Sequence, residues 1–218
     1  MKIVISLAAL DSTDVDTCRK WRNRYEIWRW CRQSDFISDV EQADWFARQS
    51  ADKSIKMYKI LCDGAMVGVC GLTSIDWINR RAEFSLYTDP DKHGHGYGKE
   101  ALKILLIHAF TNLNLNLIWC ESFDGNPAIK MFHEICFKFD GTRRQFYFKD
   151  GKYIDAHIAS LTAEEWRNHG KPCDNPRVAG PDEPTAESLD TPDVRKRGKA
   201  AKPKLKVAEK SETETASN

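Results

Sequence analysis

A glycine-rich segment in the middle of the chain has the composition of an anion-binding turn. It reads His-Gly-His-Gly-Tyr-Gly-Lys from His93 to Lys99, between a predicted strand and a predicted helix. Glycines let the backbone approach a ligand closely, and the free amides at a helix start attract an anion such as pyrophosphate. The segment is neither a P-loop nor a dinucleotide fingerprint, because no Ser or Thr follows Lys99 and the glycine spacing differs. The alternative is that these glycines only form a tight turn.

The strand before this turn carries a candidate proton acceptor. Side chains alternate along a strand, so Glu83, Ser85 and Tyr87 share one face. Glu83 is the candidate general base, acting directly or through water. The alternative is an ion pair between Glu83 and Arg80 or Arg81. No metal site is predicted, because the two histidines of the glycine-rich segment have no third ligand nearby.

The elements that must position these residues alternate between strands and helices. Apolar alternation and turn pairs predict strands at residues 2–9, 55–62, 66–76, 81–88, 115–123, 143–149 and 152–161. Helical periodicity predicts helices at residues 11–24, 38–49 and 127–135, and one that opens at the glycine-rich turn and ends near residue 112. The pattern is typical of an α/β fold with a mixed sheet.

Aromatic residues and prolines mark the end of the predicted domain. All 7 Trp, 6 Tyr and 10 Phe occur at or before Trp166, whereas six of the 8 prolines follow His169. We therefore expect a globular domain at residues 1–166 and a disordered tail at 167–218. The tail has a basic run from Arg195 to Lys206 and an acidic, Ser/Thr-rich end. It is either a solvated tail or an electrostatic contact site for nucleic acid or another partner.

Composition narrows the class of protein. The 218 residues have a net charge of only +1, which gives no general attraction to nucleic acid or anionic membranes. No apolar run is long enough for a membrane span, and the weak likeness of residues 2–10 to a signal peptide is better explained by a first strand. Seven cysteines, an odd number with no C-x-x-C pair, predict a reducing, cytoplasmic location.

Together with further segments of the chain, the glycine-rich segment resembles the GNAT superfamily of N-acetyltransferases. His93–Gly98 matches that family's acetyl-CoA loop, Arg/Gln-x-x-Gly-x-Gly/Ala, except at its first residue. Ala128–Phe137 resembles the family's A-I-x-L-Y-E-K-x-G-F helix. Trp21-Arg22-Asn23 resembles a segment of the ribosomal-protein branch, while Phe148–Asp155 with Glu165-Trp166 resembles enzymes that acetylate nucleotide-linked amino sugars in pseudaminic acid synthesis.

This resemblance implies a GNAT fold, with a mostly antiparallel sheet flanked by helices, and acetyl-CoA as the acyl donor. The CoA contacts it implies come from Leu86, Tyr87, Thr88, His93, Gly94, His95, Gly96, Tyr97, Gly98, Lys99, Asn126, Lys130 and Phe132. The first helices would shape the acceptor pocket through Trp21, Arg22, Asn23 and Trp28. As a second reading, the tryptophans, Trp30 included, would belong to the core.

The resemblance leaves the proton donor for the departing thiolate open. The family's usual tyrosine falls on Phe132, its usual glycine on Cys136 and its usual asparagine on Gly125, next to Asn126. Tyr87 is the candidate catalytic donor beside Glu83, with Tyr97 or solvent as alternatives.

The expected partner is a small-molecule amine such as a nucleotide-linked amino sugar, with no membrane and a monomer or homodimer. The alternatives are a protein N-terminal amine, an amine of tRNA or a modified DNA base, or a CoA-binding module without turnover.

Overall fold

A seven-stranded sheet forms the centre of the computed structural model, which describes residues 4–168. Its strands are β1 (Ile5–Ala9), β2 (Lys56–Cys62), β3 (Ala65–Asp76), β4 (Arg81–Thr88), β5 (Leu117–Phe123), β6 (Lys138–Lys149) and β7 (Lys152–Thr162). The spatial order is β1-β2-β3-β4-β5-β7-β6, and every neighbouring pair is antiparallel except β4 with β5. The predicted α/β fold with a mixed, mostly antiparallel sheet is confirmed.

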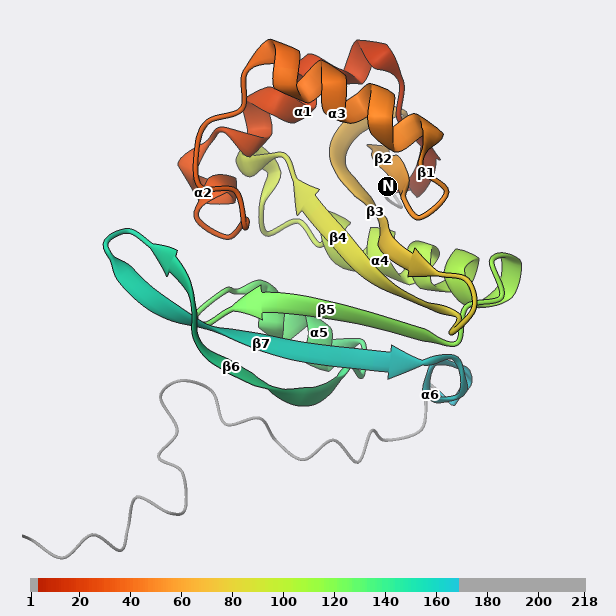
Figure 1. Cartoon of the computed structure of the whole chain (residues 1–218). Coiled ribbons are helices and arrows are strands. Elements are labelled where there is room, and N and C mark those ends of the chain that lie inside the picture. The colour runs from red at the N-terminus through yellow and green to blue at the C-terminus, as the bar shows by residue number, and fades with distance from the viewer. Residues whose placement is uncertain (1–3, 169–218) are drawn as a thin grey trace, which may run out of the picture. The chain divides into compact units, whose positions relative to one another are not determined.

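Helices cover both faces of this sheet (Figure 1). The first group is α1 (Val15–Arg22), α2 (Tyr25–Trp28) and α3 (Asp39–Ala51), and the second is α4 (Tyr97–Ile107) and α5 (Ala128–Glu134). A short α6 (Ala163–Arg167) follows β7. A π-helical turn at His108–Asn112 extends α4 to the predicted end near residue 112.

Side-chain alternation in β4 divides the core between the two faces. Phe84 and Leu86 belong to the larger cluster, which also contains Leu102 and Leu105 of α4. Tyr87 points the other way and packs against a smaller cluster of Leu10, Cys18 and Val69. The predicted division of β4 into two faces is therefore confirmed, and Glu83 lies on the face of Tyr87.

Two short helices and one strand end were not predicted. The one-turn helix α2 and the five-residue α6 are too short for a periodic pattern to reveal. β6 begins at Lys138, five residues before the expected strand, because its exposed, polar first half lacks apolar alternation. Trp21, Trp28 and Trp30 do not share one helix, since Trp21 lies in α1, Trp28 ends α2 and Trp30 follows it.

Nearly all of the predicted tail, including the basic run at 195–206, lies outside the described residues. Only Arg167 and Asn168 of it are described, at the end of α6. Among residues 4–168, no helix has the length and apolar character needed to cross a membrane.

Candidate functional site

β4 and β5 separate after only three residue pairs. The parallel ladder joins Arg81 to Leu117, Ala82 to Ile118 and Glu83 to Trp119, and then ends. Beyond it β4 continues to Thr88 and β5 to Phe123, and the two strands diverge (Figure 1). Since β4 remains paired with β3 as far as Thr88, only its edge toward β5 is left without a strand partner among the described residues. A ligand with amide groups can pair with such an edge.

The glycine-rich turn leads α4 toward this opening. Gly96 is the N-cap of α4 with φ = 80°, a left-handed conformation that favours glycine. Gly98 allows close packing, because a Cβ at this position would lie 3.1 Å from Leu86 Cδ2. The first amides of α4 have no intrahelical acceptor. This is the helix end at which the sequence predicts anion binding.

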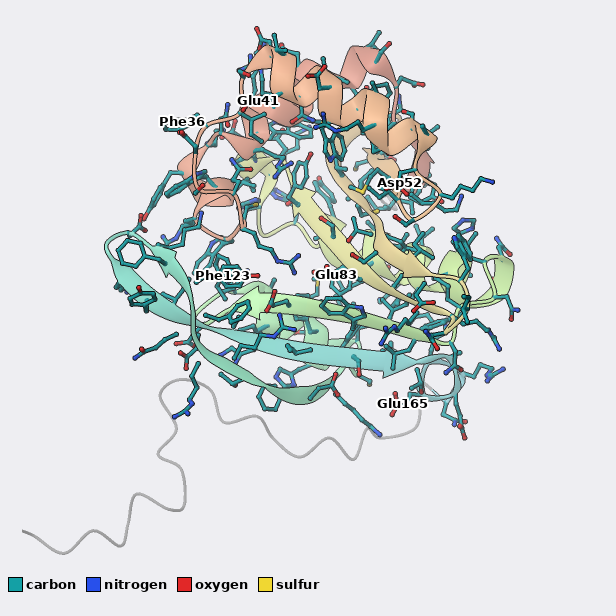
Figure 2. All side chains as sticks on the ribbon, in the orientation of Figure 1. Phe36, Glu41, Asp52, Glu83, Phe123 and Glu165 are labelled. Carbon is teal, nitrogen blue, oxygen red and sulfur yellow. The ribbon has the colours of Figure 1, made fainter. Side chains whose placement is uncertain are left out.

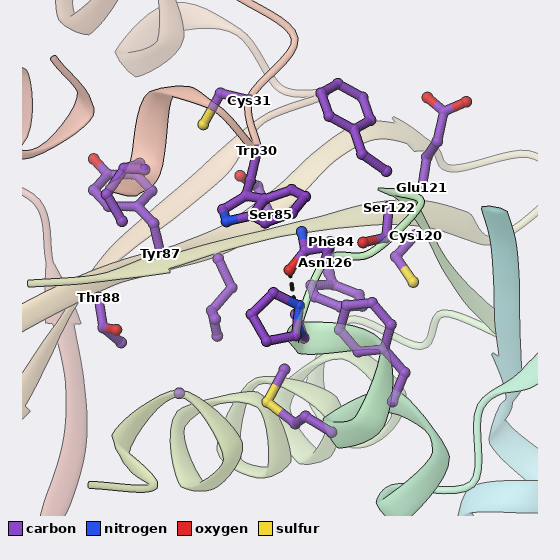
Figure 3. Close-up of a pocket in the computed structure, with 18 of the residues that line it drawn as sticks. Trp30, Cys31, Phe84, Ser85, Tyr87, Thr88, Cys120, Glu121, Ser122 and Asn126 are labelled. Carbon is purple, nitrogen blue, oxygen red and sulfur yellow. Dashed lines mark hydrogen bonds between the residues drawn. The ribbon is translucent and has the colours of Figure 1, made fainter. Parts of the chain in front are cut away.

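A cleft of about 950 Å³ connects the turn with the diverging strands (Figure 3). Its walls include the free half of β4, the end of β5, the start of α5 and the segment after α2. Eleven of the predicted CoA contacts line it: Leu86, Tyr87, Thr88, His93, Gly94, Gly96, Gly98, Lys99, Asn126, Lys130 and Phe132. The structure thus brings most of that set together.

Two predicted CoA contacts, His95 and Tyr97, are not among the lining residues. Their rings stack on each other, with centroids 5.5 Å apart. His95 Nδ1 also lies 3.0 Å from the His93 carbonyl oxygen and 3.1 Å from that of Lys92. This pair braces the glycine-rich turn from outside, and its contact with CoA stays a prediction.

Two buried carboxylates face the cleft where the strands separate, Glu83 on β4 (Figure 2) and Glu121 on β5 (Figure 3). Their side chains are 9% and 2% exposed. Both bind one guanidinium, that of Arg32. It forms a two-point contact with Glu83, one arm at 3.2 Å and the other shorter, and lies 3.1 Å from Glu121 Oε2. The ion pair predicted with Arg80 or Arg81 does not form, because Arg80 binds Asn114 and Arg81 binds Asp76.

Glu121 has two further partners from β6. Arg143 Nη1 lies 2.9 Å from Glu121 Oε1, and the Tyr147 hydroxyl donates a hydrogen bond of 2.8 Å to Glu121 Oε2. Burial and this hydrogen bond raise the pKa of Tyr147. Arg143 and Tyr147 therefore fix the position of the Glu121 carboxylate at the edge of the cleft.

The candidate proton donors differ in their access to the cleft. Tyr87 lines it, and burial raises the pKa of its hydroxyl, which also interacts with the Cys18 thiol. Tyr97 is not among the lining residues and interacts with Cys62. Phe132 lines the cleft and packs edge-to-face on Phe84, with ring centroids 5.4 Å apart. Because its side chain has no hydroxyl group, it cannot donate a proton.

Of the four predicted acceptor contacts, only Arg22 lines the cleft. Asn23 joins its side-chain amide to both backbone groups of Ile37, with two bonds of 2.8 Å. Trp28 packs beneath the Lys149 ammonium, 4.1 Å from the ring centroid. Trp21 is half-buried in α1. Asn23 and Trp28 therefore hold the acceptor-side segment in place, and direct contact of these three with an acceptor stays a prediction.

Sequence reasoning missed Arg32, Glu121 and Ser122. A local signal existed for Glu121, because it is the only charged residue within the mostly apolar strand Leu117–Phe123. Arg32 gave none, since it lies in an irregular segment and its partner Glu83 is 51 positions away. Ser122 is 5% exposed, and its hydroxyl has no hydrogen-bond partner among the described residues. A buried polar atom of this kind, on a cleft wall, fits a ligand that would complete it.

Within residues 4–168, no three metal-ligating side chains gather closely enough to hold an ion. The site consists of a glycine-rich helix start with free amides, an open strand edge and two buried carboxylates. This combination suits a ligand that carries phosphates at one end and amides along its length, beside a basic or cationic second ligand.

Comparison with known proteins agrees with this arrangement. Residues 5–136 match the family model described as an acetyltransferase (GNAT) domain. Spermidine N(1)-acetyltransferase of Escherichia coli K12 is 26% identical over 153 residues, which cover 70% of this chain and 82% of the relative. The putative ribosomal N-acetyltransferase YdaF of Bacillus subtilis is 31% identical over 124 residues, covering 56% and 67%.

A solved structure shows the same fold. It is the spermidine N-acetyltransferase from Vibrio cholerae in complex with CoA and spermine, with a TM-score of 0.72 and 23% identity. The match covers 75% of this chain and 98% of that one.

Proposed function

This chain belongs to the acetyltransferase (GNAT) domain family and is an acetyl-CoA-dependent N-acetyltransferase, and we propose that its acceptor is a small cationic amine of the polyamine type. The observation that carries the proposal is the pair of buried carboxylates, Glu83 and Glu121, at the point where β4 and β5 separate. The named spermidine acetyltransferases among its relatives support the same acceptor class.

The cleft residues fit acetyl-CoA, which supplies the acyl group and a thiolate leaving group. The amides of the first turn of α4 would bind the pyrophosphate, since Gly94 and Gly96 hold positive φ angles with open space beside them. Lys99 adds a positive charge there, although its ammonium is shared with Glu134 at 2.6 Å. The open edge of β4 would pair with the amides of the pantetheine arm.

Glu83 is the proposed general base. An acceptor amine arrives as an ammonium and must lose a proton before its nitrogen can attack. Glu83 lies at the end of the three-pair ladder, where an acyl group bound along β4 would reach the acceptor side of the cleft. Glu121 would bind the same cation beside Glu83, and Arg143 and Tyr147 hold its carboxylate in position. We propose Tyr87, or solvent, as the source of the proton for the thiolate.

A panel of acceptors tests this proposal. Purified full-length protein is incubated with acetyl-CoA and, separately, with spermidine, a UDP-linked amino sugar and a peptide with a free N-terminus, and each product is identified by mass spectrometry. We expect acetylated spermidine at the highest kcat/KM. Preferential acetylation of the amino sugar or the peptide would reject the polyamine acceptor, and restore the pseudaminic-type or the ribosomal-type hypothesis respectively.

The same panel tests the alternative that the protein binds CoA but does not catalyse acetyl transfer. That alternative predicts CoA binding in calorimetry and no acetylated product with any amine.

A further inference from the structure

Arg32 occupies the place at which the carboxylate pair would receive an acceptor's positive charge. Its guanidinium bridges Glu83 on β4 and Glu121 on β5, and these two carboxylates come from opposite sides of the strand opening. The bridge therefore crosses the acceptor side of the cleft, which Arg32 itself lines.

The backbone that carries Arg32 is held independently of this bridge. Lys149 donates hydrogen bonds to the carbonyls of Gln33 and, at 3.5 Å, Trp28, on both sides of Arg32. Asn23 binds both backbone groups of Ile37 farther along. With the segment held this way, the Arg32 side chain can leave the carboxylates by rotating, and its 46% exposure gives it a path to solvent.

Charge balance argues that Arg32 and an acceptor ammonium exclude each other. Glu83 and Glu121 carry two negative charges, and Arg32 and Arg143 carry two positive charges. An added ammonium would leave one unbalanced positive charge beside carboxylates that are almost fully buried, which is unfavourable. Exchange of the Arg32 guanidinium for the ammonium keeps the cluster neutral.

We propose that Arg32 is a specificity-determining residue that competes with the acceptor's cation for Glu83 and Glu121. This inference rests on the proposed function, because it assumes that the acceptor is cationic. Each acceptor must displace Arg32 before it binds, so the residue raises the apparent KM for cationic amines and has no effect on acetyl-CoA. An amine that cannot displace the guanidinium is excluded from the site.

The test is Arg32→Gln in the full chain. We expect its KM for spermidine to fall by about fivefold to tenfold, since one ion-pair competitor is removed. Calorimetric Kd values for spermidine, measured without acetyl-CoA, should fall by the same factor, and the Kd for CoA should not change. Arg48→Gln is the matched control. It removes the same charge from an exposed position on α3 outside the cleft, so its constants should equal those of the wild type.

A spermidine KM and Kd that are unchanged or higher in Arg32→Gln would overturn the proposal, because Arg32 would then support acceptor binding. Arg32→Lys covers the case in which Arg32→Gln does not fold. A lysine cannot make the two-point contact with Glu83, so a smaller decrease in KM and Kd is expected, and no decrease contradicts the inference.

Failure of the proposed function has a different signature, in which the wild type acetylates other amines but not spermidine. Arg32 is then judged by binding alone. Arg32→Gln must still bind spermidine more tightly than the wild type does. If Arg32→Gln binds no spermidine, the inference is overturned.

Discussion

Glu83 and Trp119 are the last residue pair between β4 and β5, and the parallel ladder ends with them. The Glu83 carboxylate lies at the closed end of the cleft and the free edge of β4 runs from there to the glycine-rich turn. The length of the ladder thus determines how much of the β4 edge is left free between Glu83 and the glycine-rich turn.

Replacing Glu83 by Gln should remove the proton acceptor. We expect kcat for spermidine to fall by about 100-fold or more, in the range typical of general base catalysis. The value of kcat is measured against pH at saturating acetyl-CoA. The increase of kcat with pH that the wild type shows should be altered in the variant. Glu100→Gln is the control, because Glu100 is exposed on α4 and pairs only with Lys103 among the described residues. A wild-type pH profile for Glu83→Gln would reject Glu83 as the base.

Replacing Gly96 by Leu should damage the anion-binding turn. A leucine at φ = 80° costs about 1–2 kcal/mol of stability and places a side chain where the ligand's phosphates would lie. Gly64→Leu is the matched control, since Gly64 has φ = 84° in the β2–β3 turn, away from the cleft. Both variants should unfold at lower urea concentration, and only Gly96→Leu should raise the Kd for acetyl-CoA, by about tenfold or more. Equal affinities in the two variants would contradict the assignment of the turn.

Replacing Ser122 by Ala should weaken ligand binding without weakening the fold. The Ser122 hydroxyl is buried without a partner in residues 4–168, so its removal relieves an unsatisfied group. We expect an unchanged or higher unfolding temperature and a Kd for acetyl-CoA raised about fivefold, equivalent to roughly 1 kcal/mol for one hydrogen bond. Ser160→Ala on β7, outside the cleft, should change neither the affinity nor the kinetics. A loss of stability with unchanged affinity would show that Ser122 is only structural.

The N-terminus of α3 gives a pH-dependent prediction. The Ser38 backbone N–H and hydroxyl both donate to Glu41 Oε2, at 2.8 and 2.7 Å, and they lower the pKa of that carboxyl. The stabilisation is therefore fully present above the unfolded pKa of about 4.3 and is lost as the pH falls through the lower folded value. Urea unfolding of the wild type and Glu41→Gln should differ most at neutral pH and converge in acid.

Glu164→Gln is the control for this measurement. Glu164 is an exposed first-turn carboxylate of α6 for which the described residues show no capping bond. A gap between wild type and Glu41→Gln that stays constant down to the acid range would contradict the capping role.

Local sequence features predicted the helices and strands. The part of the site that depends on contacts between residues far apart in the sequence was not predicted. The Asp63-Gly64 pair marks the β2–β3 turn, and Gly96 marks the start of α4, because each needs a backbone conformation that glycine favours. The mostly apolar segment 115–123 predicted β5, and the single charge in it was the available sign of Glu121.

Arg32 could not be found in this way. Its role depends on where an irregular segment lies over the sheet, and Asn23 and Lys149 determine that position from elements far apart in the sequence. Trp28 was predicted as an acceptor contact by resemblance, but its ring packs against Lys149 instead of lining the cleft.

Calorimetry on the full chain tests the central claim most directly. The protein is saturated with CoA and then titrated with spermidine, for the wild type and for Glu121→Gln. We expect one CoA per chain, and spermidine binding that is weakened about tenfold or more in the variant, where Arg143 is left without its carboxylate partner. An absence of CoA binding, or equal spermidine affinity in both proteins, would contradict it.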